Sequence, residues 1–182
     1  PDPDFRQKDD HPAVMTSWDD AQAFCAWLTE VDRMKGKLGQ DEHYRLPTDH
    51  EWSCAVGIGR EENSEENPLT KSNKITGIFP WGTEWPPPKK AGNFYGEEAK
   101  QNLSKTHKQI PMDGYDDGFD RTASVGSFEV NDFGLYDMSG NVWEHCEDTV
   151  VAKGKKKRVI RGGFWGDVSQ DELRSSRRSS CV

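Results

Sequence analysis

The stretch NDFGLYDMSGNVWEHCED, residues 131–148, decides how the rest of the chain is interpreted. It places two carboxylates, Asp137 and Glu144, on either side of a Gly140 and Asn141 pair. Glycine and asparagine readily adopt the positive φ of a tight turn. The carboxylates and the main-chain carbonyls that such a turn exposes could form an oxygen cage for a hard cation. On these residues alone, an ordinary turn is favoured, in which the aspartate caps its own backbone and a tryptophan fills the core.

The composition predicts one loop-rich domain. The length of 182 residues suits a single domain, and 17 Gly and 10 Pro indicate many turns. Hydrophobic residues make up 32% of the chain, so its seven Trp and eight Phe must supply much of the buried area. The net charge of −8 argues against general binding to nucleic acid, and no run approaches the ~18 apolar residues of a membrane span. We therefore expect neither a nucleic-acid nor a membrane partner, and the compartment stays undecided.

Two capping boxes predict two helices early in the chain. Asp20 follows Ser17, and Glu51 follows Thr48, three residues on in each case, which is the spacing of reciprocal caps between side chain and backbone. The second helix is expected to be short. The first carries an apolar stripe at helical spacing, so we expect a core helix; the stripe consists of Ala21, Phe24, Cys25, Leu28 and Val31.

The second half of the chain predicts short antiparallel strands. Residues 149–152 and 158–161 have the pattern of a hairpin, with residues 153–157 as its turn. Early helices, late strands and much irregular chain indicate the α+β class with little regular structure. The polar stretches 60–77 and 97–108 lack periodicity and are expected to be surface insertions in a single domain over residues 1–182.

The four cysteines do not indicate a closed zinc site. They include no CxxC pair and have no histidine at zinc-finger spacing. Cys25 and Cys54 lie among the apolar residues of the two predicted helices, where buried free thiols are expected. Four aspartates within residues 113–120 repel one another unless they are solvated or bind a cation. Their spacing favours a solvated loop and leaves a cation site open.

Four blocks of the chain carry a family resemblance. Residues 134–144, GLYDMSGNVWE, resemble the GLYDMxGNVWEW signature of the formylglycine-generating enzymes, also called sulfatase-modifying factors. Residues 11–27, 45–52 and 161–165 resemble further blocks of that family, in the family's order. The resemblance implies a C-type-lectin-like fold. It also implies that this chain lacks the family's N-terminal segment and its C-terminal GFR-type strand.

The resemblance implies two structural calcium sites made of oxygen ligands. At the first, Asp137 and Glu144 match side-chain ligands, while Gly140 and Val142 match main-chain carbonyl ligands. The second has side chains from two positions and carbonyls from two; it maps to Asn93, Phe94, Asp117 and Phe119. Both sets are anionic and contain oxygen donors throughout, as calcium prefers. Calcium is therefore the expected cofactor.

The resemblance gives no support to the family's oxidase chemistry in this chain. The enzymes hold copper(I) with two cysteines that follow the RGG motif, and soft thiolates suit that ion. The matching positions here are Asp167 and Glu172. Cys181 lies later, and one thiol cannot make a two-thiolate site. We therefore do not expect a copper cofactor.

These observations favour a non-catalytic module that binds a protein, a peptide or a small molecule. Its recognition surface is predicted in the tail after the RGG motif, at Trp165, Asp167, Glu172, Arg174 and Arg178. An oxidase that converts a sulfatase cysteine to formylglycine stays an alternative, with a displaced thiol pair such as Cys146 and Cys181. A diversified binding protein of a retroelement is a further alternative, as is an accessory domain of a multidomain protein, for example one fused to a kinase.

Overall fold

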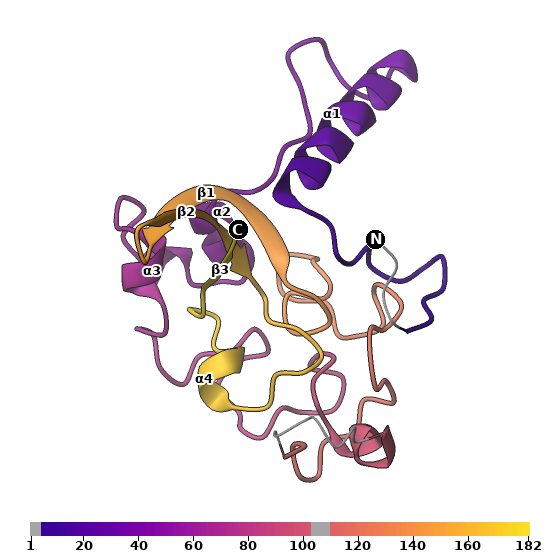
Figure 1. Ribbon diagram of the computed structural model, residues 1–182, viewed down its shortest axis with the longest axis vertical. Helices are drawn as coiled ribbons and strands as arrows, with labels where there is room; N and C mark the ends of the chain where they lie inside the picture. The colour runs from indigo at the N-terminus through magenta and orange to yellow at the C-terminus, as the bar shows by residue number, and fades with distance from the viewer. Residues whose placement is uncertain (1–4, 103–109) are drawn as a thin grey trace.

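The computed structural model describes residues 5–102 and 110–182, which contain few helices and a small antiparallel sheet (Figure 1). In chain order, the elements of this α+β fold are α1 (Trp18–Met34), α2 (Asp49–Ala55), the 3₁₀ turn η1 (Gly59–Glu61), α3 (Pro68–Lys71), the 3₁₀ turn η2 (Glu97–Asn102), β1 (Glu144–Ala152), β2 (Lys155–Arg161), α4 (Gln170–Leu173) and β3 (Ser179–Cys181). Among the described residues, no helix combines the length and the apolar character needed to cross a membrane.

Both predicted capping boxes begin helices. The Ser17 side chain accepts a hydrogen bond from the amide of Asp20, and the Asp20 carboxylate accepts one from the amide of Ser17. Thr48 and Glu51 make the same reciprocal pair at the start of α2. Each pair satisfies amide groups that a helix start would otherwise leave unbonded. The two predicted helix starts are therefore confirmed.

The expectation that the first helix is a core helix is wrong. In α1, Phe24 and Trp27 are 57% and 55% exposed, and none of the five stripe residues is buried. Figure 1 shows α1 projecting away from the sheet and the other helices. Its first turn is anchored, because the Trp18 indole donates to the carbonyl of Cys146 at 2.9 Å. Apolar periodicity identifies a helix face but does not show that another element covers it.

The predicted hairpin is confirmed, with longer strands and a tighter turn than expected. The sheet order is β1-β2-β3, and both neighbouring pairs are antiparallel. In the hairpin, Glu144 lies opposite Arg161, and Ala152 lies opposite Lys155. Lys153 and Gly154 form the turn, both with positive φ. The tail after β2 folds into α4 and the edge strand β3.

The core consists of two clusters. The first packs α2 and the loop after it against the sheet and contains Trp52, Val56, Ile58, Cys146, Val150 and Val159. The second is aromatic and joins loops to α4; its members are Phe79, Phe94, Met112, Tyr115 and Leu173. Burying one such side chain stabilises a fold by about 1.5–3 kcal/mol. The expectation for two thiols is wrong, because Cys54 is exposed and Cys25 is half-buried.

The predicted surface insertions contribute to the interior at defined points. Most of residues 60–77 are exposed or half-buried, but Lys71 in α3 is 3% exposed, so the expectation is wrong there. In residues 97–108, Ala99 of η2 is buried. Residues 103–108 lie outside the described part of the chain. The polar composition of residues 60–77 indicated exposure, but Lys71 is buried because it forms ion pairs with Asp49 and Glu62.

Candidate functional site

The four residues of the first predicted calcium site line one small cavity. Asp137, Gly140, Val142 and Glu144 lie around a space of about 180 Å³. The turn between the two carboxylates places them there, since Gly140 has a φ of +72° and Asn141 a φ of +59°. A Cβ atom at Gly140 would overlap the carbonyl oxygen of Asn93, so this turn requires glycine.

The two carboxylates of this cavity are poorly compensated. Asp137 Oδ2 accepts a hydrogen bond from the amide of Gly126 at 2.7 Å, but its Oδ1 is buried without a partner among the described residues. Glu144 Oε2 accepts a bond from the Trp52 indole at 2.6 Å. Burial, with the charge of Asp137, raises the pKa of Glu144 to about 7, and burial also raises the pKa of Asp137. A cation between these groups would remove both penalties.

The second predicted site is organised by Asp117. Its Oδ2 accepts a hydrogen bond from the amide of Phe94 at 2.8 Å, and its Oδ1 accepts one from the amide of Phe119 at 2.9 Å. Asn93 is buried beside them, and its Oδ1 has no described partner. Burial, with the charges of nearby acidic residues, raises the pKa of Asp117 to about 7. Both Asp117 oxygens already bind amides, so the first site fits a cation better.

The metal-ligand chemistry of these sites depends on carbonyls as well as carboxylates. Across residues 5–102 and 110–182, no three His, Cys, Asp or Glu side chains form a cluster that could hold a metal ion. The first site offers two carboxylates, and its remaining predicted ligands are main-chain oxygens. Calcium binds main-chain carbonyl oxygens as well as carboxylates, so the residues present fit that ion. Calcium stays a prediction for both sites.

The two positions that match the family's thiols hold the backbone of the tail. Asp167 is 3% exposed, and its Oδ2 accepts a hydrogen bond from the amide of Phe164 at 3.0 Å. Glu172 Oε2 accepts bonds from the amides of Val168 and Ser169, which makes the capping box of α4. Neither carboxylate supplies a soft ligand, so these positions do not fit copper(I).

The predicted recognition surface is only partly a surface. Trp165 lines an open apolar pocket of about 400 Å³, to which Phe5, Trp143 and Phe164 also contribute. Arg174 is half-buried and pairs with Asp171 at 2.7 Å. Arg178, by contrast, is 1% exposed, and Asp167 is buried. Placing these two side chains on an exposed surface was therefore wrong.

The family relationship is decided by the whole chain. A family model described as the sulfatase-modifying factor enzyme 1-like domain matches residues 1–182. The chain belongs to this family. The inactive C-alpha-formylglycine-generating enzyme 2 of Bos taurus is 31% identical over 166 residues, and the formylglycine-generating enzyme of Mus musculus is 32% identical over 182 residues. Each alignment covers 91% of this chain, but 42% and 38% of the relative, so the chain spans about two fifths of the length of these relatives.

A solved structure supports the same fold. PvdO from Pseudomonas aeruginosa matches this sulfatase-modifying factor domain with a TM-score of 0.61 at 22% sequence identity. The match covers 100% of this chain and 60% of PvdO. At this identity the likeness shows the fold alone. One of these relatives is named a formylglycine-generating enzyme and the other an inactive one, so the family relationship does not show whether this chain is catalytic.

The sulfatase-modifying factor domain also contains a buried ion cluster that the sequence did not indicate. Asp49 in α2 accepts bonds from Arg161 at 2.5 Å, Arg178 at 2.9 Å and Lys71 at 3.0 Å. Glu62 contacts Arg178 as well, and lies 3.7 Å from Lys71. All five side chains are at most 4% exposed. Arg178 therefore helps to join the tail to α2.

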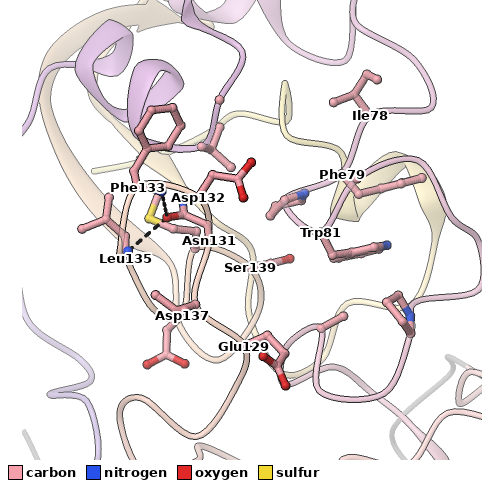
Figure 2. A pocket seen from close by; sticks show the side chains of 18 of the residues that line it. Ile78, Phe79, Trp81, Glu129, Asn131, Asp132, Phe133, Leu135, Asp137 and Ser139 are labelled. Atoms are coloured by element: carbon pink, nitrogen blue, oxygen red, sulfur yellow. Dashed lines mark hydrogen bonds between the residues drawn. The ribbon is translucent and has the colours of Figure 1, made fainter.

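A pocket that no sequence motif indicated lies on another part of the domain. It encloses about 460 Å³ next to the 129–139 loop, and Figure 2 shows its lining. Phe79 and Trp81 line it with their rings stacked, 5.0 Å apart and tilted by 4°. Glu129, Asp132 and Ser139 are among its polar residues. Phe79 and Trp81 are close in the sequence, but nothing in the sequence indicated that the 129–139 loop would face these two rings.

Proposed function

We propose that this chain is a binding domain of the sulfatase-modifying factor family, without the oxidase activity and stabilised by calcium. The observation that carries the proposal is the use of Asp167 and Glu172. Both stand where the resemblance places copper-binding thiols, and both are committed to hydrogen bonds that hold the tail backbone. A hard carboxylate does not replace a soft thiolate for copper(I).

The first carboxylate cavity supports a structural role for calcium. A divalent ion there would neutralise Asp137 and Glu144 and would be completed by the carbonyls of Gly140 and Val142. Such an ion would tie the turn before β1 to the sheet. In a domain with so little regular structure, this staple would stabilise the loops of the proposed C-type-lectin-like fold. The cluster of Asn93, Phe94, Asp117 and Phe119 is the second proposed calcium site, with the weaker fit.

The proposed ligand surface is the apolar pocket around Trp165. Concave, largely apolar sites with aromatic walls suit small molecules or apolar side chains of a peptide. Trp143 and Phe164 line the same pocket, so three aromatic residues can contact one ligand. Glu172 lies in α4, which follows this segment, and Arg174 comes directly after that helix. The partner is proposed to be a protein, a peptide or a small molecule.

An oxidase that forms formylglycine is the alternative, and one of the named relatives is a formylglycine-generating enzyme. It would need a displaced thiol pair, such as Cys146 with Cys181. Cys146 is fully buried, and burial raises the pKa of its thiol to about 12, which disfavours the thiolate that a metal requires. The roles of a retroelement binding protein and of an accessory domain stay open predictions.

The first test measures metal dependence. We expect EGTA to lower the melting temperature and calcium, but not magnesium, to restore it. A hundredfold excess of calcium over its Kd contributes about 2.7 kcal/mol to the free energy of unfolding. Asp137→Asn should abolish most of the calcium effect. Asp41→Asn, an exposed acid outside the cavity, should preserve it.

The second test separates binding from catalysis. The reduced protein should not bind copper(I) stoichiometrically, and it should not form aldehyde on a cysteine-containing sulfatase peptide with oxygen and copper. Tight copper(I) binding together with aldehyde formation would overturn the proposed loss of oxidase activity. Purified protein that contains no calcium and does not respond to added calcium would overturn the calcium proposal. The two parts of the proposal can therefore fail separately.

A further inference from the structure

The pocket in Figure 2 has a rigid aromatic wall. Phe79 is 3% exposed and stacks on Trp81. The turn between them is closed by two hydrogen bonds, from the Phe79 amide to the Gly82 carbonyl at 2.7 Å and from the Gly82 amide to the Phe79 carbonyl at 2.9 Å. The Trp81 indole donates to the carbonyl of Glu84 at 3.0 Å. Trp81 is therefore held in place before any ligand arrives.

A buried hydroxyl faces this wall without a partner. Ser139 is 3% exposed, and its Oγ has no hydrogen-bond partner among the described residues. In Figure 2 the Ser139 hydroxyl points toward Trp81. A buried polar group that makes no hydrogen bond costs free energy, and a ligand that bonds to it recovers that cost. This hydroxyl is independent evidence that the pocket receives a polar group.

The charge of the pocket is negative. Glu129 and Asp132 are both exposed, and within the described part of the chain neither carboxylate forms an ion pair. Asp137 is half-buried and also lines the carboxylate cavity. Lys89 is the basic residue of the lining. The chain itself has a net charge of −8, which attracts cations over longer distances.

We propose that this pocket binds a basic side chain, arginine above all, presented by a partner polypeptide. The guanidinium group carries a charge that matches Glu129 and Asp132, donates to the Ser139 oxygen, and is attracted to the face of a tryptophan. Phe133 at the rim is 64% exposed and offers apolar surface to the rest of a peptide. A neutral sugar would also stack on Trp81, but it would leave the acidic charges unbalanced. This inference requires neither calcium nor the Trp165 pocket.

The test follows the indole N–H signal of Trp81 by NMR during titration with blocked Gly-Arg-Gly. We expect saturable shifts of this signal. Blocked Gly-citrulline-Gly has nearly the same shape without the charge and should bind at least roughly tenfold more weakly. The double variant Glu129→Gln, Asp132→Asn should weaken binding of the arginine peptide by a similar factor. Both replaced side chains are exposed, so the variant should fold.

Two matched variants separate local from general charge effects. Asp41→Asn with Glu61→Gln removes two exposed acids elsewhere and should change affinity less than about twofold, because salt screens distant charges. Lys89→Gln removes the like charge and should strengthen binding. Equal binding of the citrulline peptide, an equal loss in the control variant, stronger shifts with methyl glucoside, or an unmoved Trp81 signal would each overturn the proposal. Because Asp137 lines both sites, the titration is run in EGTA; arginine-specific binding there supports the pocket proposal whether or not calcium stabilises the protein, so the two proposals can fail separately.

Discussion

The ion cluster around Asp49 and the cavity around Glu144 both bury carboxylates, but they treat the charge in opposite ways. In the cluster, three cations surround Asp49 and Glu62. Burial alone would raise the pKa of Asp49, yet the bonds and charges of its basic partners outweigh burial and hold this pKa at about 2. In the cavity, burial raises the pKa of Glu144 to about 7.

Trp52 separates the two regions. The guanidinium of Arg161 lies over the Trp52 ring, 4.2 Å from its centroid, while the Trp52 indole donates to Glu144. Arg161 pairs with Glu144 in the strand register, but its side chain binds Asp49 instead. The cluster therefore contains its own counter-charges, whereas no basic side chain is among the described residues that line the cavity. That contrast is the physical reason to expect a cation in one place and not in the other.

The largest effect should come from removing the central acid of the ion cluster. Asp49→Asn leaves three buried cations with Glu62, and we expect the free energy of unfolding to fall by about 3–5 kcal/mol in urea titrations. The exposed pair of Arg45 and Glu51 has equally short bonds, 2.7 and 2.6 Å, and serves as the control. Arg45→Met should cost about 0.2–1 kcal/mol. A similar loss in both variants would mean that burial does not distinguish the pairs.

Glu144→Gln tests the carboxylate cavity, because calcium should reverse the sign of its effect on the free energy of unfolding. Without calcium, the variant should be more stable than the natural sequence at about pH 8, because it removes a buried, uncompensated charge and keeps an oxygen for Trp52. With a thousandfold excess of calcium over Kd, it should be less stable, since it then loses most of a contribution of about 4.1 kcal/mol, which is larger than the charge penalty that the substitution removes. Glu147→Gln, at an exposed position in β1, should show no such reversal. The same sign under both conditions would remove the argument for a cation.

Lowering the pH should weaken the ion cluster, because it protonates Asp49. The folded-state pKa of Asp49, about 2, lies below its usual value of 3.8. Its stabilising contribution is therefore complete above the usual value and is lost as pH falls through the folded value. The stability deficit of Asp49→Asn should be about 2 kcal/mol smaller at about pH 2 than at about pH 5. A deficit that does not change with pH would show that Asp49 acts through its shape rather than its charge.

Local patterns in the sequence predicted local structure well. Ser17 and Thr48 begin helices because a cap and its partner lie three residues apart. Ser169 and Glu172 have the same spacing and begin α4, so the sequence also carries the signal for this helix. The residues of the first cavity were grouped by family resemblance, and the fold brings them together around one space.

Features that depend on distant residues could not be predicted. Arg178 lies 129 positions from Asp49, and nothing in the polar tail or in residues 60–77 indicates that their charges meet in the interior. The exposure of Phe24 and Trp27 could not be predicted for a related reason. Periodicity describes the face of one helix, whereas burial requires a second element that packs against that face. Ser139 and Trp81 likewise meet only through the fold.

The one-sided attachment of α1 has a consequence for dynamics. Trp18 fixes its first turn, with Arg158 stacked 3.5 Å from the Trp18 ring, and Tyr44 bonds to Thr29 and Asp32 farther along. Near the end of the helix, Arg33 donates to the carbonyl of Glu42 at 2.6 Å, which is a contact with the loop that follows and not with the sheet. An isolated helix of this length is marginal in water. The end at Met34 can therefore unwind while the sheet stays intact. Local unfolding, rather than global stability, then sets how quickly its amides exchange hydrogen with solvent.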